Sequence, residues 1–288
     1  MLLCLPGLLL AQDDTDIYLF DNIKFENYGV RLGNRVQITD AVGYDNQPTF
    51  SSDGSFIFYT AIRDGKQADI YRYSLETKTT VQVTNTSESE YSPTPLPGGT
   101  HLSVVKVEKD GTQRIWKVPI LGKKKKQEVL VPKVDSVGYH CWINPETLVV
   151  FVLGKKPTLR KVDVATQTET VLAHNIARGM QKVPGKNAVY FTQKIKGKLH
   201  LMHCDLASNA IDTLAPMPLE TQDLLVMNTG KLYCADQGSV FEFDPAHPGD
   251  WTIVDSFPET RFFGPSRMAA SPDGRKYAVV FVESDAPD

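Results

Sequence analysis

The stretch Asp45–Gly54, DNQPTFSSDG, places a β-prone segment directly before a tight turn, and variants of it recur along the chain. The turn clusters end at intervals of 39 to 47 residues, which is the period of repeats that contain about four short strands. Pro and Gly suit these turns because they supply a preset or a positive φ. The clusters are Ser51–Gly54, Leu96–Gly99, Asn144–Glu146, Val183–Gly185, Asn228–Gly230 and Ser271–Gly274.

Each turn cluster is followed by an apolar, β-prone run. Such runs, with turn residues on both sides, are typical of strands buried between neighbouring sheets. We find no helical periodicity of useful length, so the fold class is predicted to be all-β. The runs are Ser55–Tyr59, His101–Val105, Thr147–Val152, Ala188–Thr192, Lys231–Cys234 and Tyr277–Val282.

The two ends of the chain carry complementary parts of one repeat. Asp16–Phe20 and Val36–Thr39 match the third and fourth strands of the first complete unit, Asp69–Tyr73 and Val81–Thr84. Arg267–Val282 supplies a first and a second strand only. Pairing the two fragments closes the ring and removes an exposed sheet edge. The sequence therefore predicts a single six-bladed β-propeller over residues 12–288, with the N-terminal strands closing the last blade.

The repeat resembles that of TolB-like propellers. The resemblance rests on Asp45–Gly54 followed by Asp69-Ile70-Tyr71, and on Ser271–Arg275, which is the same element in purer form. It covers the chain after the leader and implies a six-bladed propeller. TolB itself carries an additional N-terminal α/β domain, which is not expected here. The resemblance thus implies a propeller without implying the Tol-system partners of that family.

The first residues predict export. Met1–Gln12 is apolar and stops at Asp13, far short of the roughly 20 apolar residues that span a bilayer. Leu9-x-Ala11 has the form of a signal-peptide cleavage site, so residues 1–11 are predicted to be a signal peptide and the protein to be periplasmic or otherwise exported. No Lys or Arg precedes the apolar run, and a buried N-terminal strand is the alternative.

The net charge, the cysteines and a run of lysines each bear on the partners and the chemistry that the sequence predicts. The net charge of −3 gives no reason to expect a nucleic-acid partner. Cleavage of the leader would leave Cys141, Cys204 and Cys234, each in or beside an apolar, strand-like stretch, so buried free thiols are expected rather than a disulfide framework. Lys123–Lys126 lies at a predicted hairpin tip, where it is either solvated or in contact with an anionic lipid or glycan.

Two aligned positions precede the innermost strand of each blade and are expected to line the axial funnel. The first holds Asp45, Glu90, Val137, Ile176, Thr221 and Pro265, and the second holds Gln47, Ser92, Tyr139, Arg178, Asp223 and Arg267. Neither position is uniformly carboxylate or histidine, so no axial metal and no cofactor are expected. Together with nearby aromatic residues, the mixture predicts a polar pocket, acidic beside blades one and two and basic beside blades four and six. The predicted ligand-binding residues at the funnel mouth are Asp45, Glu90, Tyr91, His140 and Arg178.

No catalytic signature is found in the sequence. There is no nucleophile elbow, and His200 and His203 lie three apart on a predicted strand, hence on opposite faces. Propeller lyases related to the TolB-like fold use histidine with a metal ion, but His101, His140 and His174 fall at unmatched repeat positions. The predicted function is therefore a monomeric, non-catalytic propeller that binds a protein, peptide or glycan at its funnel or rim. The alternatives are a hydrolase or lyase acting on sugars or peptides at the same funnel, and a structural scaffold domain of a cell-envelope assembly.

Overall fold

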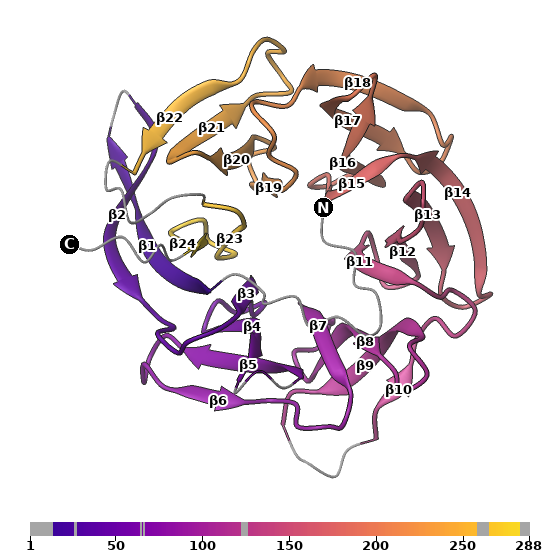
Figure 1. Ribbon diagram of the computed structural model, residues 1–288. Helices are drawn as coiled ribbons and strands as arrows, with labels where there is room; N and C mark the ends of the chain where they lie inside the picture. The colour runs from indigo at the N-terminus through magenta and orange to yellow at the C-terminus, as the bar shows by residue number, and fades with distance from the viewer. Residues whose placement is uncertain are drawn as a thin grey trace.

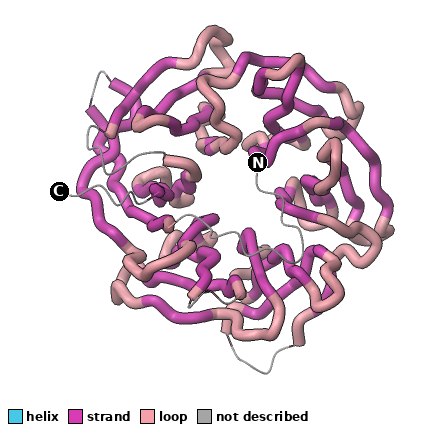
Figure 2. The backbone as a smooth tube through the Cα atoms, viewed as in Figure 1, coloured by secondary structure: helices cyan, strands magenta, loops and turns pink. Residues whose placement is uncertain are grey.

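The computed structural model describes residues 14–25, 28–63, 65, 67–121, 126–257 and 265–282. In these residues six four-stranded antiparallel sheets surround a central axis (Figure 1), and no helix occurs (Figure 2). The predicted all-β, six-bladed propeller is confirmed. None of the described segments forms a helix with the length and apolarity needed to cross a membrane.

The strands run outward from the axis in each blade. Blade one contains β3 (Asp45–Phe50), β4 (Phe56–Ile62), β5 (Ala68–Ser74) and β6 (Thr80–Gln82), and blade two contains β7 (Ser89–Pro95), β8 (His101–Val107), β9 (Gln113–Pro119) and β10 (Glu128–Val129). Blade three contains β11 (Val137–Trp142), β12 (Thr147–Val152), β13 (Thr158–Asp163) and β14 (Thr168–His174), and blade four contains β15 (Ile176–Lys182), β16 (Ala188–Ile195), β17 (Lys198–Asp205) and β18 (Ile211–Pro216). Blade five contains β19 (Leu225–Val226), β20 (Leu232–Asp236), β21 (Ser239–Phe243) and β22 (Thr252–Ser256). Blade six contains β23 (Met268–Ala270), β24 (Lys276–Val282), β1 (Thr15–Phe25) and β2 (Tyr28–Gln37).

Blade six joins the two ends of the chain as predicted. Its strand order is β2-β1-β24-β23, and β1 pairs with β24 from Thr15↔Val282 to Asp21↔Lys276. An ion pair of 2.6 Å between Lys276 Nζ and Asp21 Oδ1 extends this pairing to the side chains. The ring is thus closed by hydrogen bonds between segments more than 250 residues apart.

The repeated turn has a hydrogen-bonding reason for its sequence. In blade one, Ser51 Oγ donates to Asp53 Oδ1 at 2.6 Å and accepts from the Phe56 amide at 2.9 Å, while Gly54 adopts a φ of 73°. The hydrogen bond from the Ser51 hydroxyl, with those from the hydroxyl and the amide of Ser55, lowers the pKa of Asp53 to about 2. The equivalent turn of blade six repeats these bonds with Ser271, Asp273, Lys276 and Gly274.

The outer end of the repeat is also fixed by a side chain. The Ile17 amide donates to Thr39 Oγ1 at 2.8 Å, and Thr39 Oγ1 donates to Asp16 Oδ1 at 2.7 Å. The Thr39 hydroxyl therefore takes the place of a backbone carbonyl as the acceptor for the Ile17 amide. The paired strand β2 consequently ends at Gln37, and not at Thr39 as the sequence predicted. The corresponding bond in blade one joins Ile70 and Thr84.

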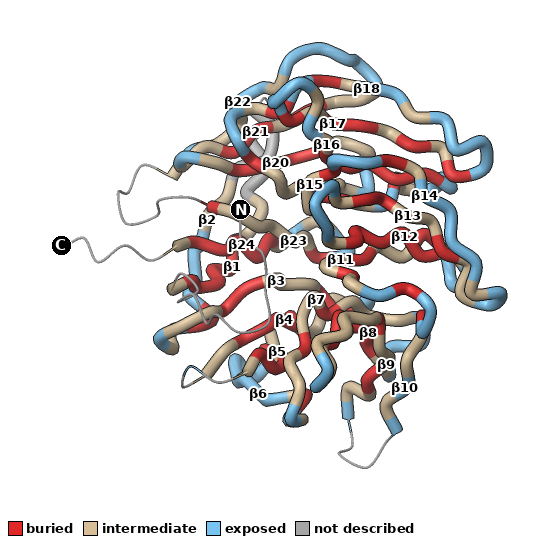
Figure 3. Tube along the Cα trace, turned by 45° about the vertical axis from the view of Figure 1, so that its right-hand side comes forward, coloured by how far each residue is buried: buried red, intermediate tan, exposed pale blue. Residues whose placement is uncertain are grey.

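The core consists of apolar clusters between neighbouring blades rather than one central core. In most blades the second strand is the most deeply buried one, as the red segments of Figure 3 show. Phe58 and Ile70 of blade one, for example, pack against Leu102, Val104 and Val118 of blade two. Side chains fill the space between the blades, and the innermost strands line the axis.

Candidate functional site

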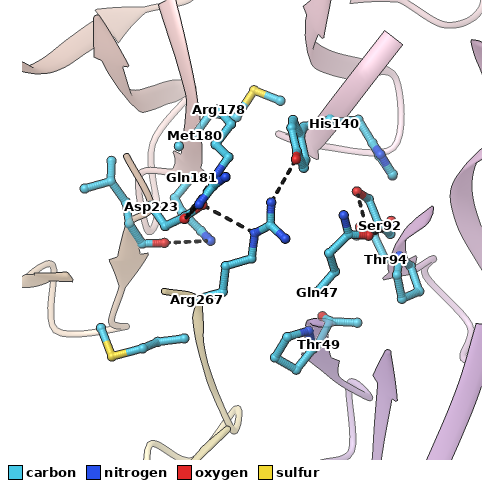
Figure 4. A pocket seen from close by; sticks show the side chains of 16 residues that line it. Gln47, Thr49, Ser92, Thr94, His140, Arg178, Met180, Gln181, Asp223 and Arg267 are labelled. Atoms are coloured by element: carbon cyan, nitrogen blue, oxygen red, sulfur yellow. Dashed lines mark hydrogen bonds and ion pairs between the residues drawn. The ribbon is translucent and has the colours of Figure 1, made fainter. Parts of the chain in front are cut away.

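A cavity of about 170 Å³ lies at the axis, where the innermost strands of the blades meet. It receives one residue from each blade at the second aligned position: Gln47, Ser92, Tyr139, Arg178, Asp223 and Arg267 (Figure 4). Pro48, Thr49, Pro93, Thr94, His140, Gly179, Met180, Gln181, Leu224 and Met268 complete the lining. The cavity therefore combines polar groups from all blades with several apolar side chains.

β-Bulges turn the lining residues toward the axis. The register of β3 against β4 shifts between Asn46 and Thr49, and Gln47 has a φ of 58°. Blade two repeats this at Ser92, with a φ of 53°. A bulge breaks strand alternation and re-aims a side chain. Here it brings Gln47 Oε1 within 2.6 Å of the Ser92 amide, which donates to it across the blade junction.

Asp223 lies between two arginines. Arg178 donates from Nε at 2.9 Å and from Nη2 at 2.5 Å to Asp223 Oδ2, and Arg267 Nε lies 3.4 Å from Asp223 Oδ1. Burial alone would raise the pKa of Asp223, but the two guanidinium groups hold it below its ordinary value. The carboxylate is therefore ionised and shared by two cations.

Arg267 is the central side chain of the pocket (Figure 4). Its Nη1 donates to Asn46 Oδ1 at 2.8 Å, and its Nη2 donates to the Tyr139 hydroxyl, also at 2.8 Å. Its guanidinium also lies over the Tyr139 ring, 5.3 Å from the centroid. Arg267 thus connects blade six with blades one, three and five and is held in one orientation.

The pocket carries a net positive charge. Arg178 and Arg267 face one carboxylate, Asp223, and the remaining described lining residues bear no carboxylate or ammonium. Burial lowers the pKa of His140 to about 4, so its imidazole is neutral at physiological pH. The lining therefore has a charge of about +1. The predicted basic side near blades four and six lies in the pocket, whereas its one acid comes from blade five.

His140 is committed to a structural contact. Its Nε2 lies 2.7 Å from Ser103 Oγ, which also accepts a hydrogen bond from Trp142 Nε1 at 2.9 Å. Ser103 is completely buried, and His140 Nδ1 has no partner among the described residues. A serine–histidine nucleophile needs a third group that orients the imidazole and a hydroxyl that substrate can reach. Among the described residues no third group contacts the His140 imidazole, and the Ser103 hydroxyl is buried.

Asp45 and Glu90 lie outside the pocket lining, although they were predicted at the funnel mouth. Both side chains are fully buried. Asp45 Oδ1 accepts from Arg63 at 2.6 Å, and Glu90 Oε1 lies 3.4 Å from Lys106 Nζ. The bulges separate them from the next aligned position, so the acidic side expected beside blades one and two does not face the axis.

Of the other three predicted binding residues, two line the pocket and one does not. His140 and Arg178 line the pocket, while Tyr91 packs against the apolar cluster between blades two and three. The repeat alignment places Gln47, Asp223 and Arg267 at the axis, but they are not among the predicted binding residues. Identical spacing from the six turns was the signal that could have found them.

Buried carboxylates make stability depend on pH. Burial raises the pKa of Asp45 to about 6 and that of Glu90 to about 7, against about 3.9 and 4.3 in an unfolded chain. The native state therefore holds more protons between about pH 4 and pH 7, and these two groups lower the free energy of unfolding as pH rises through that range, by up to about 1.4 kcal/mol per group per pH unit.

We expect Glu90→Gln to flatten this dependence, because the amide cannot ionise while Lys106 keeps Glu88 at 2.9 Å. Urea unfolding of both proteins at pH 5 and pH 8 measures the difference. Glu128→Gln, at an exposed outer-strand position paired with Lys117, is the control and should leave the slope unchanged. An unchanged slope in Glu90→Gln would contradict the assignment.

The remaining sequence candidates lie away from the axis. His200 and His203 are half-buried on β17 and flank Leu201 and Met202 of the strand core. Cys141, Cys204 and Cys234 are free, the last two are buried, and burial raises the pKa of all three thiols. Within the described ranges, no three His, Cys, Asp or Glu side chains converge in a way that could hold a metal ion. The predicted leader and Lys123–Lys125 lie outside the described residues, and Lys126 is exposed.

Comparison with known proteins identifies the fold. No protein-family model and no curated protein sequence matches the chain. A protein described as a TolB from Agrobacterium tumefaciens superposes with a TM-score of 0.73 at 15% identity, over 95% of this chain and 99% of that one. The fold is that of a TolB-like propeller. TolB from Acinetobacter baumannii gives a TM-score of 0.61 at 12% identity, and the match covers 94% of this chain and 64% of that one.

The chain is also similar to an oligogalacturonate lyase solved in complex with manganese. The TM-score is 0.60 at 15% identity, over 87% of this chain and 80% of the lyase. Similarity at these identities is a statement about fold. It confirms the resemblance found in the repeat and leaves function to the site itself.

Proposed function

We propose that this protein is an exported, monomeric and non-catalytic binding propeller, and that its ligand is a peptide segment of a partner protein that enters the axial pocket. The observation that carries the proposal is the arginine pair around Asp223. It places two partly buried cations, which are held in one orientation, in the lining of a concave site. Concave sites with a few well-placed polar groups among apolar ones are typical of ligand binding.

Several observations favour binding over turnover. Acid–base catalysis needs a titratable group near the substrate with a pKa close to the working pH. Asp45 and Glu90 have such pKa values but lie outside the pocket lining. In the lining, Asp223 is held ionised by its arginines and His140 is held neutral by burial.

The pocket favours a peptide over a glycan. Sugar rings commonly pack on exposed aromatic faces, and the aromatic rings in the lining are those of Tyr139 and His140. The Arg267 guanidinium lies 5.3 Å from the centroid of the Tyr139 ring and donates to its hydroxyl, and His140 is 9% exposed. Met268, which is partly exposed in the lining, offers an apolar contact to an amino-acid side chain instead.

A ligand screen with a filled pocket tests the proposal. Thr49→Trp adds a large side chain to the lining, and Thr170→Trp adds the same side chain to the exposed outer strand β14. A displayed peptide library and a glycan array are each probed with the wild type and both variants. We expect selected peptides to lose binding to Thr49→Trp and to keep it with Thr170→Trp.

Other outcomes contradict the proposal in different ways. Retained binding to Thr49→Trp would place the ligand at the rim. Selective capture of glycans would assign the pocket to a sugar ligand. Conversion of a bound compound, detected by mass spectrometry and lost in Thr49→Trp, would favour the hydrolase or lyase alternative. Absence of any pocket-dependent ligand would favour the scaffold alternative.

A further inference from the structure

We propose that the axial pocket recognises the free carboxyl terminus of a peptide, with Arg178 as the principal contact. This inference rests on the proposed function and names the chemical group that the pocket would select. It is carried by three features of the described residues: the unbalanced charge of the lining, the free edge of one guanidinium, and the size of the cavity.

The charge of the lining favours one negative charge. Asp223 balances one of its two arginines and leaves a charge of about +1 in a partly desolvated site. The side chains of Asp223 and Arg267 are 15% and 14% exposed, so water screens them only in part. A single carboxylate would neutralise the pocket. A phosphate dianion would leave an excess negative charge there.

The geometry supplies donors for that carboxylate. Arg178 spends its Nε and Nη2 on Asp223, whereas its Nη1 donates to no described residue. Its side chain is 35% exposed and lines the pocket, so a ligand can reach it. Gln47 adds a further donor: its Oε1 accepts from Thr60 and Ser92, which orients the amide while its Nε2 has no partner among the described residues. The lining therefore offers N–H donors to an anion on two separate side chains.

The size of the cavity favours a chain end. A cavity of about 150 Å³ holds a molecule the size of benzene, and this one measures about 170 Å³. It therefore accepts a terminal residue more readily than a strand passing through. Met268, a partly exposed residue of the same lining, would contact the last side chain. An acidic side chain or a uronic acid presents the same carboxylate, and the experiment separates these sources.

The test compares acids with their neutral counterparts. An N-acetylated peptide library with randomised C-terminal residues is prepared with free-acid and with amidated ends, and equilibrium dialysis with mass spectrometry measures retention by the protein. We expect the free acids to be retained about tenfold more strongly, the effect of one charge-assisted hydrogen-bond pair. Galacturonate against galactose, and internal glutamate against glutamine in amidated peptides, form the other arms.

Arg178→Met is the decisive variant because Arg267 still neutralises Asp223, so the pocket loses its excess charge without exposing a lone carboxylate. It should abolish the preference for the free acid. Arg160→Met removes an arginine from an ion pair with Glu169 on the outer strands and should leave the preference intact. Equal retention of acid and amide by the wild type, or a preference that survives in Arg178→Met, overturns the proposal while pocket binding itself stands. A preference confined to galacturonate or to internal glutamate overturns the peptide-terminus assignment. Failure of the proposed function is recognised separately, by ligands that Thr49→Trp retains.

Discussion

Replacing Asp223 with Asn is expected to lower the free energy of unfolding by about 3 kcal/mol, because removing one member of a buried ion pair leaves its partners uncompensated. Arg178 and Arg267 both depend on this carboxylate. We expect the uncompensated charge of Arg267 to account for most of this loss, since its side chain lies in the centre of the pocket with little exposure to water. Urea unfolding monitored by tryptophan fluorescence measures the change.

Asp212→Asn is the matched control for this substitution. Asp212 lies on β18 with 73% of its side chain exposed, 3.8 Å from His203, and its replacement should change stability by less than about 0.5 kcal/mol. A similarly small change in Asp223→Asn would show that the arginines are solvated rather than held by the carboxylate. The charge balance of the pocket would then have to be revised.

Gly179→Ala is expected to destabilise the protein by about 3 kcal/mol or more, and to weaken binding at the axis. A Cβ on Gly179 would lie 2.0 Å from the backbone oxygen of Gln222, a contact that backbone atoms relieve only by moving. Gly179 follows Arg178 and Gln222 precedes Asp223, so the movement separates the ion pair that joins blades four and five. Thermal unfolding measures the loss, and the ligand screen measures binding.

Gly249→Ala tests whether the effect belongs to the site. A Cβ at Gly249 meets no atom within 4 Å, so this variant should fold and bind as the wild type does. If Gly179→Ala were as stable as the wild type, β15 and the segment before β19 would have to lie farther apart than the 2.0 Å contact between this Cβ and the Gln222 oxygen implies. Comparable losses in both variants would indicate that chain flexibility, rather than contact, is responsible.

Much of the fold follows from local hydrogen bonding that the sequence records directly. The Ser51 hydroxyl and the Asp53 carboxylate close the turn before the deeply buried second strand of blade one, and Ser271 and Asp273 do so in blade six. Thr39 and Thr84 end the outer strands in the same way. Because these bonds need specific residues at fixed spacing, the repeat is visible in the sequence and its closure at the termini can be predicted.

The site is less predictable because its residues act through partners that are distant in sequence. Asp45 occupies the expected repeat position, yet Arg63 and the bulge at Gln47 place it away from the axis. Arg178 was selected, but its partner Asp223 comes from the next blade, 45 residues later. Spacing from the turns indicates which residues approach the axis. Which of them face the cavity depends on bulges and on packing between blades, and neither has a signature at a single position.

The most direct test of the account is a crystal structure of the protein with para-bromobenzoate, a carboxylate whose bromine can be located by anomalous scattering. The account predicts that the anion lies in the axial pocket with its carboxylate against Arg178 and its ring inside the same lining, and that Arg178→Met removes it. Bromine found only outside the pocket, or inside it with the carboxylate turned away from both arginines, would contradict the central claim that the axis of this propeller is an anion-selective binding site.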